Sequence, residues 1–224
     1  MLSIVLPAFN EEHRIGKPLE QLIAHRGACD YDLDVILVDD GSTDATAAVA
    51  QSYVDALPDL RILRHETNRG KGRAVATGMM AARGEYRAFF DADGSTPIVQ
   101  VDALLEAIRR APRSVAIGSI RAEGTRIGRR QPLHRNLAGR LGNAFIRGAV
   151  LPGIADSQRG CKLFPAELSD VVFGAQQIDG WGFDIEILAL TKRLGYGIIE
   201  VPIEWNHVDG GQIRAGAYAS TLSE

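Results

Sequence analysis

Short apolar runs alternate with segments of helical periodicity along the first half of the chain. Five runs have the composition of buried strands, at 3–8, 34–38, 60–63, 86–90 and 115–119. Between them, apolar residues recur every three or four positions at 15–24, 45–56, 73–82 and 101–110, as on one face of a helix. Strand alternating with helix predicts an α/β fold, with a Rossmann-like, mostly parallel sheet that helices cover on both faces.

Polar segments lie at the ends of the first four predicted strands. They read PAFNEE (7–12), DDGSTD (39–44), TNRGKG (67–72) and DADGSTP (91–97). The carboxyl ends of parallel strands meet at one edge of a sheet, and ligands bind at that edge. We therefore expect the four segments to form a single site.

The DADGSTP segment places two aspartates on the same side of a strand. In an extended backbone Asp91 and Asp93 point the same way, with Cα atoms about 6.6 Å apart. At an effective dielectric of about 20, their charges repel by about 2.5 kcal/mol. A divalent cation would turn this repulsion into attraction, because Mg²⁺ binds carboxylates together with substrate phosphates. The alternative is a solvated turn, since Asp, Gly, Ser and Pro are all turn residues.

Two further polar segments each allow two interpretations. In DDGSTD, a residue of 42–44 can cap the following helix, which leaves Asp39 and Asp40 to accept hydrogen bonds from a base or ribose. In TNRGKG, the glycines on either side of Lys71 open a helix and suit an anion. The segment matches neither glycine-rich phosphate motif, because Lys71 is not followed by Ser or Thr, as Walker A requires, and Val75 stands where GxGxxG has its last glycine.

Composition narrows the class of protein. The chain has 224 residues, 46% of them hydrophobic and 24% charged, as in ordinary globular domains. Its net charge of -3 gives no general affinity for nucleic acid. Cys29 and Cys161 form neither a disulfide framework nor a metal-binding pattern, so we expect a reducing, cytoplasmic location. We also expect no signal peptide and no transmembrane helix, because no apolar stretch is long enough.

A basic segment lies between residues 121 and 147. It contains seven arginines and a single acidic residue, Glu123. Apolar residues recur every fourth position from 133 to 145, with a polar stripe beside them. Periodicity alone favours an ordinary amphipathic surface helix, whereas the local charge favours a helix that meets anionic lipid or a phosphorylated acceptor.

Taken in order, seven segments resemble family 2 glycosyltransferases of the GT-A fold, specifically the polyprenyl- or dolichyl-phosphate sugar synthases. They are PAFNEE, DDGSTD, NRGKGRA, DADGSTP, DSQRGCKLF, FDIEIL and EVPIEW. DADGSTP and DSQRGCKLF are more similar to the dolichyl-phosphate glucosyltransferases than to the mannose synthases. The resemblance implies a single GT-A domain over 1–224, with a nucleotide-sugar-binding half at 1–120 and an acceptor-binding half at 121–224.

The resemblance also implies roles for individual residues. Those expected to line the nucleotide pocket are Pro7, Ala8, Asn10, Glu12, Lys71 and Ala92, with Asp39 or Asp40 on the base. Asp91 and Asp93 match the DxD motif of the family, where the aspartates hold the ribose and a Mg²⁺ or Mn²⁺ ion on the diphosphate. Arg121 and Arg135 match arginines around the donor and acceptor phosphates, and Asp156 and Gln158 match a motif beside the transferred sugar.

The activity that the resemblance implies is inverting, metal-dependent transfer from a nucleotide diphosphate sugar to polyprenyl or dolichyl phosphate, at the cytoplasmic face of a membrane. UDP-glucose is the favoured donor, and N-acetylgalactosamine, mannose and GDP stay open. A phosphate acceptor needs little deprotonation, so we expect Asp156 to position a substrate more than to act as a base. Lipid is expected to be reached through the basic segment or a separate membrane protein. The alternatives are a soluble acceptor, or a non-catalytic nucleotide-binding module that scaffolds a membrane partner.

Overall fold

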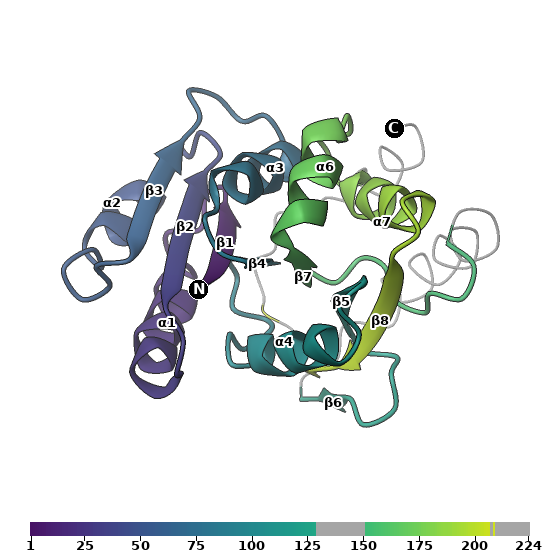
Figure 1. Ribbon diagram of the computed structural model, residues 1–224. Helices are drawn as coiled ribbons and strands as arrows, with labels where there is room; N and C mark the ends of the chain where they lie inside the picture. The colour runs from purple at the N-terminus through teal and green to yellow at the C-terminus, as the bar shows by residue number, and fades with distance from the viewer. Residues whose placement is uncertain (129–150, 207, 209–224) are drawn as a thin grey trace.

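The computed structural model of the protein describes residues 1–128, 151–206 and 208. A seven-stranded sheet runs through it in the order β3-β2-β1-β4-β7-β5-β8 (Figure 1). Along the chain its strands are β1 (Leu2–Ala8), β2 (Leu33–Asp39), β3 (Leu60–Arg64), β4 (Tyr86–Phe90), β5 (Ser114–Ser119), β7 (Cys161–Pro165) and β8 (Gly197–Pro202). The strands predicted for the first half are confirmed, each to within one residue at its ends.

Helices pack on both faces of the sheet, as predicted. They are α1 (Gly16–Ala28), α2 (Thr46–Gln51), α3 (Lys71–Ala81), α4 (Gln100–Arg110), α6 (Ala166–Ala175) and α7 (Phe183–Arg193). One hydrophobic core holds buried residues of α1, α2 and α4, and a second holds those of α3, α6 and α7 (Figure 1). None of the helices described is both long and apolar enough to cross a membrane.

The strand β7 runs antiparallel to both of its neighbours, β4 and β5, while the other pairs of this sheet are parallel. The predicted mostly parallel sheet is therefore confirmed. The reversal has a consequence for function. Cys161, at the start of β7, pairs with Phe90, at the end of β4. The residues that precede β7 thus reach the sheet at the carboxyl edge, next to Asp91.

A second, two-stranded sheet lies at the same edge. It pairs β6 (Arg126–Ile127) in parallel with β9 (Glu204–Trp205). Just beyond β9, the backbone N–H of Asn206 donates to the carbonyl of Ser95 at 2.9 Å. The segment after β8 is thereby fixed to the turn that contains Asp93.

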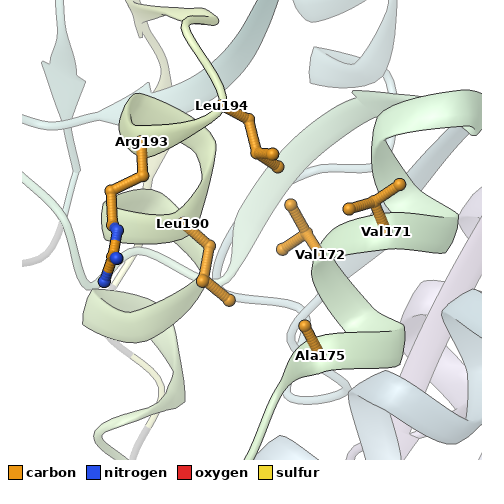
Figure 2. Close-up of a pocket in the computed structure, with 6 residues that line it drawn as sticks. All are labelled: Val171, Val172, Ala175, Leu190, Arg193 and Leu194. Atoms are coloured by element: carbon orange, nitrogen blue, oxygen red, sulfur yellow. The ribbon is translucent and has the colours of Figure 1, made fainter.

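A hollow of about 380 Å³ opens between α6 and α7 (Figure 2). It is lined by Val171, Val172, Ala175, Leu190, Arg193 and Leu194. Apart from Arg193 the lining is apolar, and it includes none of the polar residues singled out in the sequence. We therefore place the candidate site elsewhere, at the carboxyl edge of the sheet.

Candidate active site

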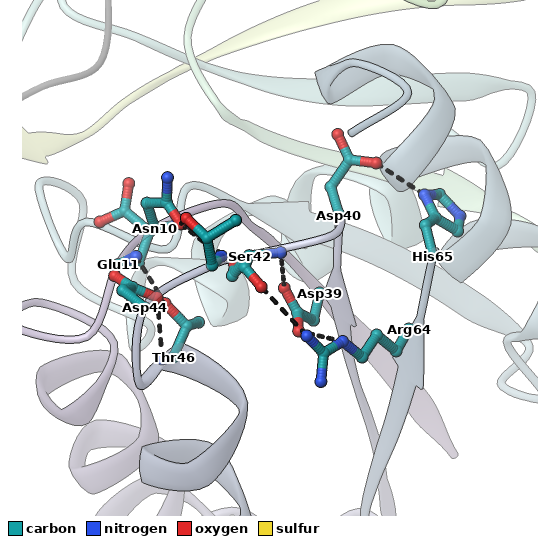
Figure 3. Close-up of polar contacts among 10 residues, drawn as sticks. Asn10, Glu11, Asp39, Asp40, Ser42, Asp44, Thr46, Arg64 and His65 are labelled. Atoms are coloured by element: carbon teal, nitrogen blue, oxygen red, sulfur yellow. Dashed lines mark hydrogen bonds and ion pairs between the residues drawn. The ribbon is translucent and has the colours of Figure 1, made fainter. Parts of the chain in front are cut away.

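Side chains from the loops after β1 and β2 bind these loops to each other (Figure 3). Asn10 has a positive φ of 53°, and its Oδ1 accepts the N–H of Thr43 at 2.9 Å. In return, Ser42 Oγ accepts the N–H of Asn10 at 3.0 Å. Glu12 Oε2 accepts the N–H of Ala45 at 2.8 Å. Asn10 and Glu12, predicted to line a nucleotide pocket, thus hold one wall of the site in place.

Three other predicted pocket residues are buried at strand ends. Pro7 and Ala8 close β1, where the Ala8 carbonyl accepts the N–H of Asp40 at 2.8 Å. Ala92 lies between the two aspartates of the DADGSTP segment and is 4% exposed. Because so little of their surface is exposed, these residues shape the strand ends that carry the polar side chains, and their contact with a nucleotide stays a prediction.

The adjacent carboxylates of Asp39 and Asp40 have different surroundings (Figure 3). Asp40 accepts the backbone N–H groups of Arg69 and Gly70, both at 2.9 Å, and lies 2.6 Å from His65 Nδ1. Asp39 Oδ1 accepts the N–H of Ser42, but the buried Oδ2 has no hydrogen bond. Its close partner is the ion-pair contact with Arg64 Nε at 3.2 Å, from a side chain that is 59% exposed (Figure 3). A buried oxygen without a hydrogen bond is costly, so Asp39 is the better candidate to accept a hydrogen bond from a base in place of the Arg64 contact. Asp40 fixes the loop before α3.

The glycines beside Lys71 are explained by close backbone packing. Gly70 has a φ of 102°, and a Cβ at this position would lie 2.4 Å from the carbonyl oxygen of Asp179. A Cβ on Gly72 would lie 2.5 Å from the carbonyl oxygen of Ile178. The Asp179 carbonyl also accepts the N–H of Arg73, in the first turn of α3. The start of α3 therefore meets the 178–180 segment, which accounts for both glycines without a bound anion.

Lys71 lies against the first aspartate of the DADGSTP segment. Its Nζ is 2.5 Å from Asp91 Oδ1, and only 14% of its side chain is exposed. Burial favours a raised pKa for Asp91, but Lys71, followed by Lys162 and Arg159, outweighs it and lowers that pKa. Burial, followed by the charge of Asp91, raises the pKa of Asp93. The two negative charges thus act on each other, but Asp93 lies in the turn after β4 and not in the extended backbone from which their spacing was predicted. Only Asp91 has a close cationic partner in the contacts described.

The segment before β7 packs directly on Asp91. The N–H of Asp91 donates to the Gly160 carbonyl at 2.8 Å. A Cβ on Gly160 would lie 2.0 to 2.2 Å from the Asp91 carboxylate, so only glycine leaves room for that group. The glycine of DSQRGCKLF is therefore part of the site, which sequence reasoning missed.

Asp156 is buried next to the end of β5. It is 2% exposed, and its Oδ2 accepts the N–H of Ile120 and the Arg159 Nε, both at 3.1 Å. Its own N–H donates to Glu200 Oε1 at 2.9 Å. A carboxylate with two donors on one oxygen is oriented by them, which suits a positioning role.

Both tryptophans contact cations of the site, although no role in the site was predicted for them from the sequence. Lys71 Nζ lies 5.0 Å from the ring centroid of Trp181. The Arg159 guanidinium lies 4.9 Å from the ring centroid of Trp205. Cation–π contacts of this kind restrict long basic side chains. Such partners come from distant segments, so no local sequence pattern indicates them.

Glu11 is a further site residue that the sequence did not single out. Its Oε1 lies 2.5 Å from Arg14, while the buried Oε2 has no hydrogen bond. Burial raises the pKa of Glu11 to about 7; Arg14 opposes the shift, and Asp93 and Asp91 add to it. The negative charges of the two aspartates thus add to the shift, whereas the neighbouring Glu12 bonds the 42–46 loop.

The family model described as Glycosyl transferase family 2 matches residues 3–173. The chain belongs to glycosyl transferase family 2. The architecture and the DADGSTP site at the carboxyl edge agree with this membership, and the chain is accordingly a glycosyltransferase.

Curated relatives and solved structures extend the assignment. The chain is 34% identical over 222 residues to a dolichyl-phosphate beta-glucosyltransferase of Trichomonas vaginalis, covering 95% of this chain and 68% of that protein. It is 32% identical over 224 residues to the dolichyl-phosphate beta-glucosyltransferase of Dictyostelium discoideum, with the same coverage. A Mycobacterium tuberculosis glucosyl-3-phosphoglycerate synthase, solved with Mg²⁺ and uridine diphosphate, superposes with a TM-score of 0.71 at 21% identity, over 100% of this chain and 77% of that one. This likeness confirms the GT-A glycosyltransferase fold.

The donor set of this family 2 chain fits a divalent cation shared with a substrate. No group of three or more His, Cys, Asp or Glu side chains within 1–128, 151–206 and 208 is arranged to hold a metal. Asp91 and Asp93 supply carboxylate oxygens, the ligands that Mg²⁺ and Mn²⁺ prefer. Two carboxylates leave most coordination positions to phosphates and water, as is usual for Mg²⁺.

The remaining predicted residues fall in two groups. Arg121 is exposed just beyond the carboxyl end of β5, and its N–H donates to Ser119 Oγ at 3.1 Å. Gln158 is half-buried in the segment between Asp156 and Gly160. Arg135 and the rest of the basic segment from residue 129 to 147 lie outside the described residues. The structure therefore brings the predicted donor-side residues together, along with Asp156.

Proposed function

We propose that this family 2 glycosyltransferase moves glucose from UDP-glucose to dolichyl phosphate or a related polyprenyl phosphate, with inversion at the anomeric carbon. The observation that carries the proposal is the Asp91–Asp93 pair at the carboxyl edge, with Lys71 Nζ 2.5 Å from Asp91. The sugar and the acceptor are inferred from the relatives named dolichyl-phosphate beta-glucosyltransferases, to which the chain is 34% and 32% identical over nearly all its length.

On the donor side, the proposal assigns the diphosphate to Lys71 and to a Mg²⁺ or Mn²⁺ ion at Asp91 and Asp93. When bound, the cation supplies electrostatic stabilisation of the charge that the leaving diphosphate gains. Asp39 accepts a hydrogen bond from the uracil through Oδ2, after the Arg64 side chain moves aside. Arg64 Nε lies 3.2 Å from that oxygen and Arg64 Nη2 donates to the Ser42 carbonyl at 3.0 Å, so the uracil must displace both contacts of a side chain that is 59% exposed.

On the acceptor side, the phosphate oxygen attacks the anomeric carbon from the face opposite the leaving diphosphate. The new C–O bond forms as the bond to the diphosphate breaks, which inverts the centre. The acceptor arrives as an anion, so no strong base is required. Asp156, with two donors on Oδ2, serves as a positioning residue. Arg121 and Arg135 are proposed to neutralise the acceptor phosphate.

We further propose a division of labour along the chain. Residues 1–120 bind the nucleotide sugar, and residues 121–224 bind the acceptor. The basic segment at 121–147, with seven arginines, offers favourable electrostatics for contact with an anionic membrane surface, where a lipid phosphate is presented. A separate membrane protein is the other route to the lipid.

A panel of donors and acceptors tests the proposal. Purified protein is incubated with Mn²⁺ and radiolabelled UDP-glucose, UDP-N-acetylgalactosamine or GDP-mannose, and with dolichyl phosphate or 3-phosphoglycerate. The proposal predicts label in the organic phase only with UDP-glucose and dolichyl phosphate. Label that appears only in a soluble product would show a soluble acceptor instead. UDP binding without any transfer would favour the non-catalytic module.

A further inference from the structure

A second lysine–aspartate pair lies close to the Lys71–Asp91 pair and is more deeply buried. It joins Lys162, the second residue of β7, to Asp184, in the first turn of α7. The side chains are 0% and 4% exposed, and Lys162 Nζ donates to Asp184 Oδ1. Burying two charges costs several kcal/mol, and apolar residues of similar volume often replace such a pair without loss of stability. Stability alone is therefore a weak reason for its presence.

Lys162 also fixes the segment that packs on Asp91. Its Nζ donates to the Arg159 carbonyl at 2.6 Å and lies 5.3 Å from the ring centroid of Phe89. The next residue after Arg159 is Gly160, whose carbonyl accepts the N–H of Asp91. The Arg159 side chain meanwhile donates to Asp156. One ammonium group therefore anchors the turn that contacts both Asp91 and Asp156.

Asp184 fixes the other side of the site. It directly follows Phe183, whose Cβ would lie 2.7 Å from a Cβ on Gly72, so the start of α7 is packed against the start of α3. Three residues before Asp184, the Trp181 ring contacts Lys71. The charge of Asp184 also acts on Lys71, and the charge of Lys162 acts on Asp91. The Lys71–Asp91 and Lys162–Asp184 pairs thus form one cluster of two positive and two negative charges.

We propose that Lys162 and Asp184 are positioning residues for sugar transfer. Neither contacts the proposed reacting atoms. Together they hold the 156–160 turn and the 178–183 segment at a fixed separation, and so place Asp91, on the donor side, relative to Asp156, on the acceptor side. The inference rests on the proposed function for what is transferred, but its consequence for UDP and metal binding is independent of the acceptor.

A charge-free replacement of the pair separates positioning from stability. The variant Lys162→Met/Asp184→Leu is compared with Arg87→Met/Asp170→Leu, which removes the ion pair between β4 and α6, with atoms 2.5 Å apart, away from the site. Thermal unfolding, kcat and KM for transfer, and UDP affinity with and without Mn²⁺ are measured for each. We expect the 162/184 variant to unfold near the wild-type temperature but to lose roughly 100-fold in kcat, as a displacement of about 1 Å does. We also expect the 162/184 variant to lose the increase in UDP affinity that Mn²⁺ gives. The Arg87→Met/Asp170→Leu control should keep both the wild-type kcat and this increase in affinity.

If the Lys162→Met/Asp184→Leu variant has the stability, the kcat and the Mn²⁺-dependent UDP affinity of the wild type, the proposal is overturned, because the pair is then structural only. If the double variant does not fold, Asp184→Asn serves in its place, since it keeps the size of the side chain. Wild-type values of kcat and Mn²⁺-dependent affinity in that variant would equally overturn the proposal. If the wild type binds UDP with Mn²⁺ but transfers no glucose to dolichyl phosphate, the proposed function fails. The Mn²⁺-dependent affinities of the variants then still decide the role of the pair.

Discussion

Replacing Gly160 with alanine tests whether the position of Asp91 controls activity. A Cβ at residue 160 would lie 2.0 Å from Asp91 Oδ1, 2.1 Å from Cγ and 2.2 Å from Oδ2. An ordinary contact between carbon and oxygen is about 3.4 Å, so the carboxylate must move by about 1.4 Å. The Lys71–Asp91 contact, now 2.5 Å, cannot survive such a shift unless Lys71 follows.

The expected cost falls on catalysis more than on folding. A misplacement of about 1 Å costs about 100-fold in rate, or about 2.7 kcal/mol in the activation free energy. Overpacking typically costs 1 to 3 kcal/mol of unfolding free energy. Because 29% of the Asp91 side chain is exposed, it has room to turn outward, and we expect about 1 kcal/mol.

The assay is the initial rate of transfer from UDP-glucose to dolichyl phosphate, with urea unfolding measured on the same preparations. Gly174→Ala is the matched control, since the nearest heavy atom to its Cβ is Met80 Cε at 4.0 Å and alanine is favoured in a helix. We expect the control to keep full activity. A folded Gly160→Ala protein within threefold of the wild-type rate would refute the reasoning.

Three further substitutions give separate tests. Asp39→Asn should weaken UDP binding by about tenfold in calorimetry, with little change in stability. Asp40→Asn should instead cost about 2 kcal/mol of unfolding free energy, because it disrupts the contacts that hold the loop before α3. Equal effects of the two variants on UDP binding would contradict the assignment of the base to Asp39. In metal-free buffer, Glu11→Gln should remove a pH dependence. Folded Glu11 keeps its proton up to about pH 7, whereas the unfolded residue loses it near pH 4.5. The unfolding free energy of the wild type, measured by urea titration, should therefore fall relative to that of the variant by about 3 kcal/mol from pH 4 to pH 8. Unfolding free energies that change in parallel with pH would contradict the raised pKa. Lys71→Met should lower the transfer rate by about 100-fold or more in kinetic assays, and weaken UDP binding by a smaller factor in calorimetry. The reason is that the Lys71 ammonium acts on charge that develops as the donor bond breaks. Equal losses in transfer rate and in UDP affinity would contradict this role.

The donor side of the site was predictable because local rules determine it. The parallel arrangement of β1, β2 and β4 brings their carboxyl ends together, and Asp91 and Asp93 directly follow the end of β4 at Phe90. The prediction of an extended backbone through both aspartates was wrong, because Asp93 lies in the turn after the strand. The start of α2 was equally local, since Asp44 Oδ1 accepts the N–H of Thr46 at 2.9 Å, although the N-cap position itself is Ala45. Patterns of this kind extend over a few residues and need no knowledge of distant partners.

Other features depend on partners far along the chain. Gly70 and Gly72 suggested an anion loop, but their close contacts are with 178–183, more than a hundred residues later. Lys162 lies in an apolar run and gives no sign of a buried partner, yet it bonds Asp184. The family resemblance pointed to Glu12 and not to Glu11, because the turn after β1 decides which carboxylate is buried against Arg14 and which bonds the 42–46 loop.

Helix ends were also less predictable than strand ends. Apolar spacing predicted a helix over 45–56, but α2 ends at Gln51. Ser52 explains the early end, since its Oγ donates to the Val49 carbonyl at 2.7 Å and so competes with continued helix hydrogen bonds. Hydrophobic spacing carries no information about this competition.

The most direct test of the account is incorporation of radiolabelled glucose from UDP-glucose into dolichyl phosphate by the wild type and by Asp93→Ala, each with Mn²⁺ and with a chelator. The account predicts label in the lipid phase for the wild type with Mn²⁺, and at least about 100-fold less with the chelator or in the variant. Comparable incorporation by Asp93→Ala, or by the chelated wild type, would contradict the assignment of this site to metal-assisted sugar transfer.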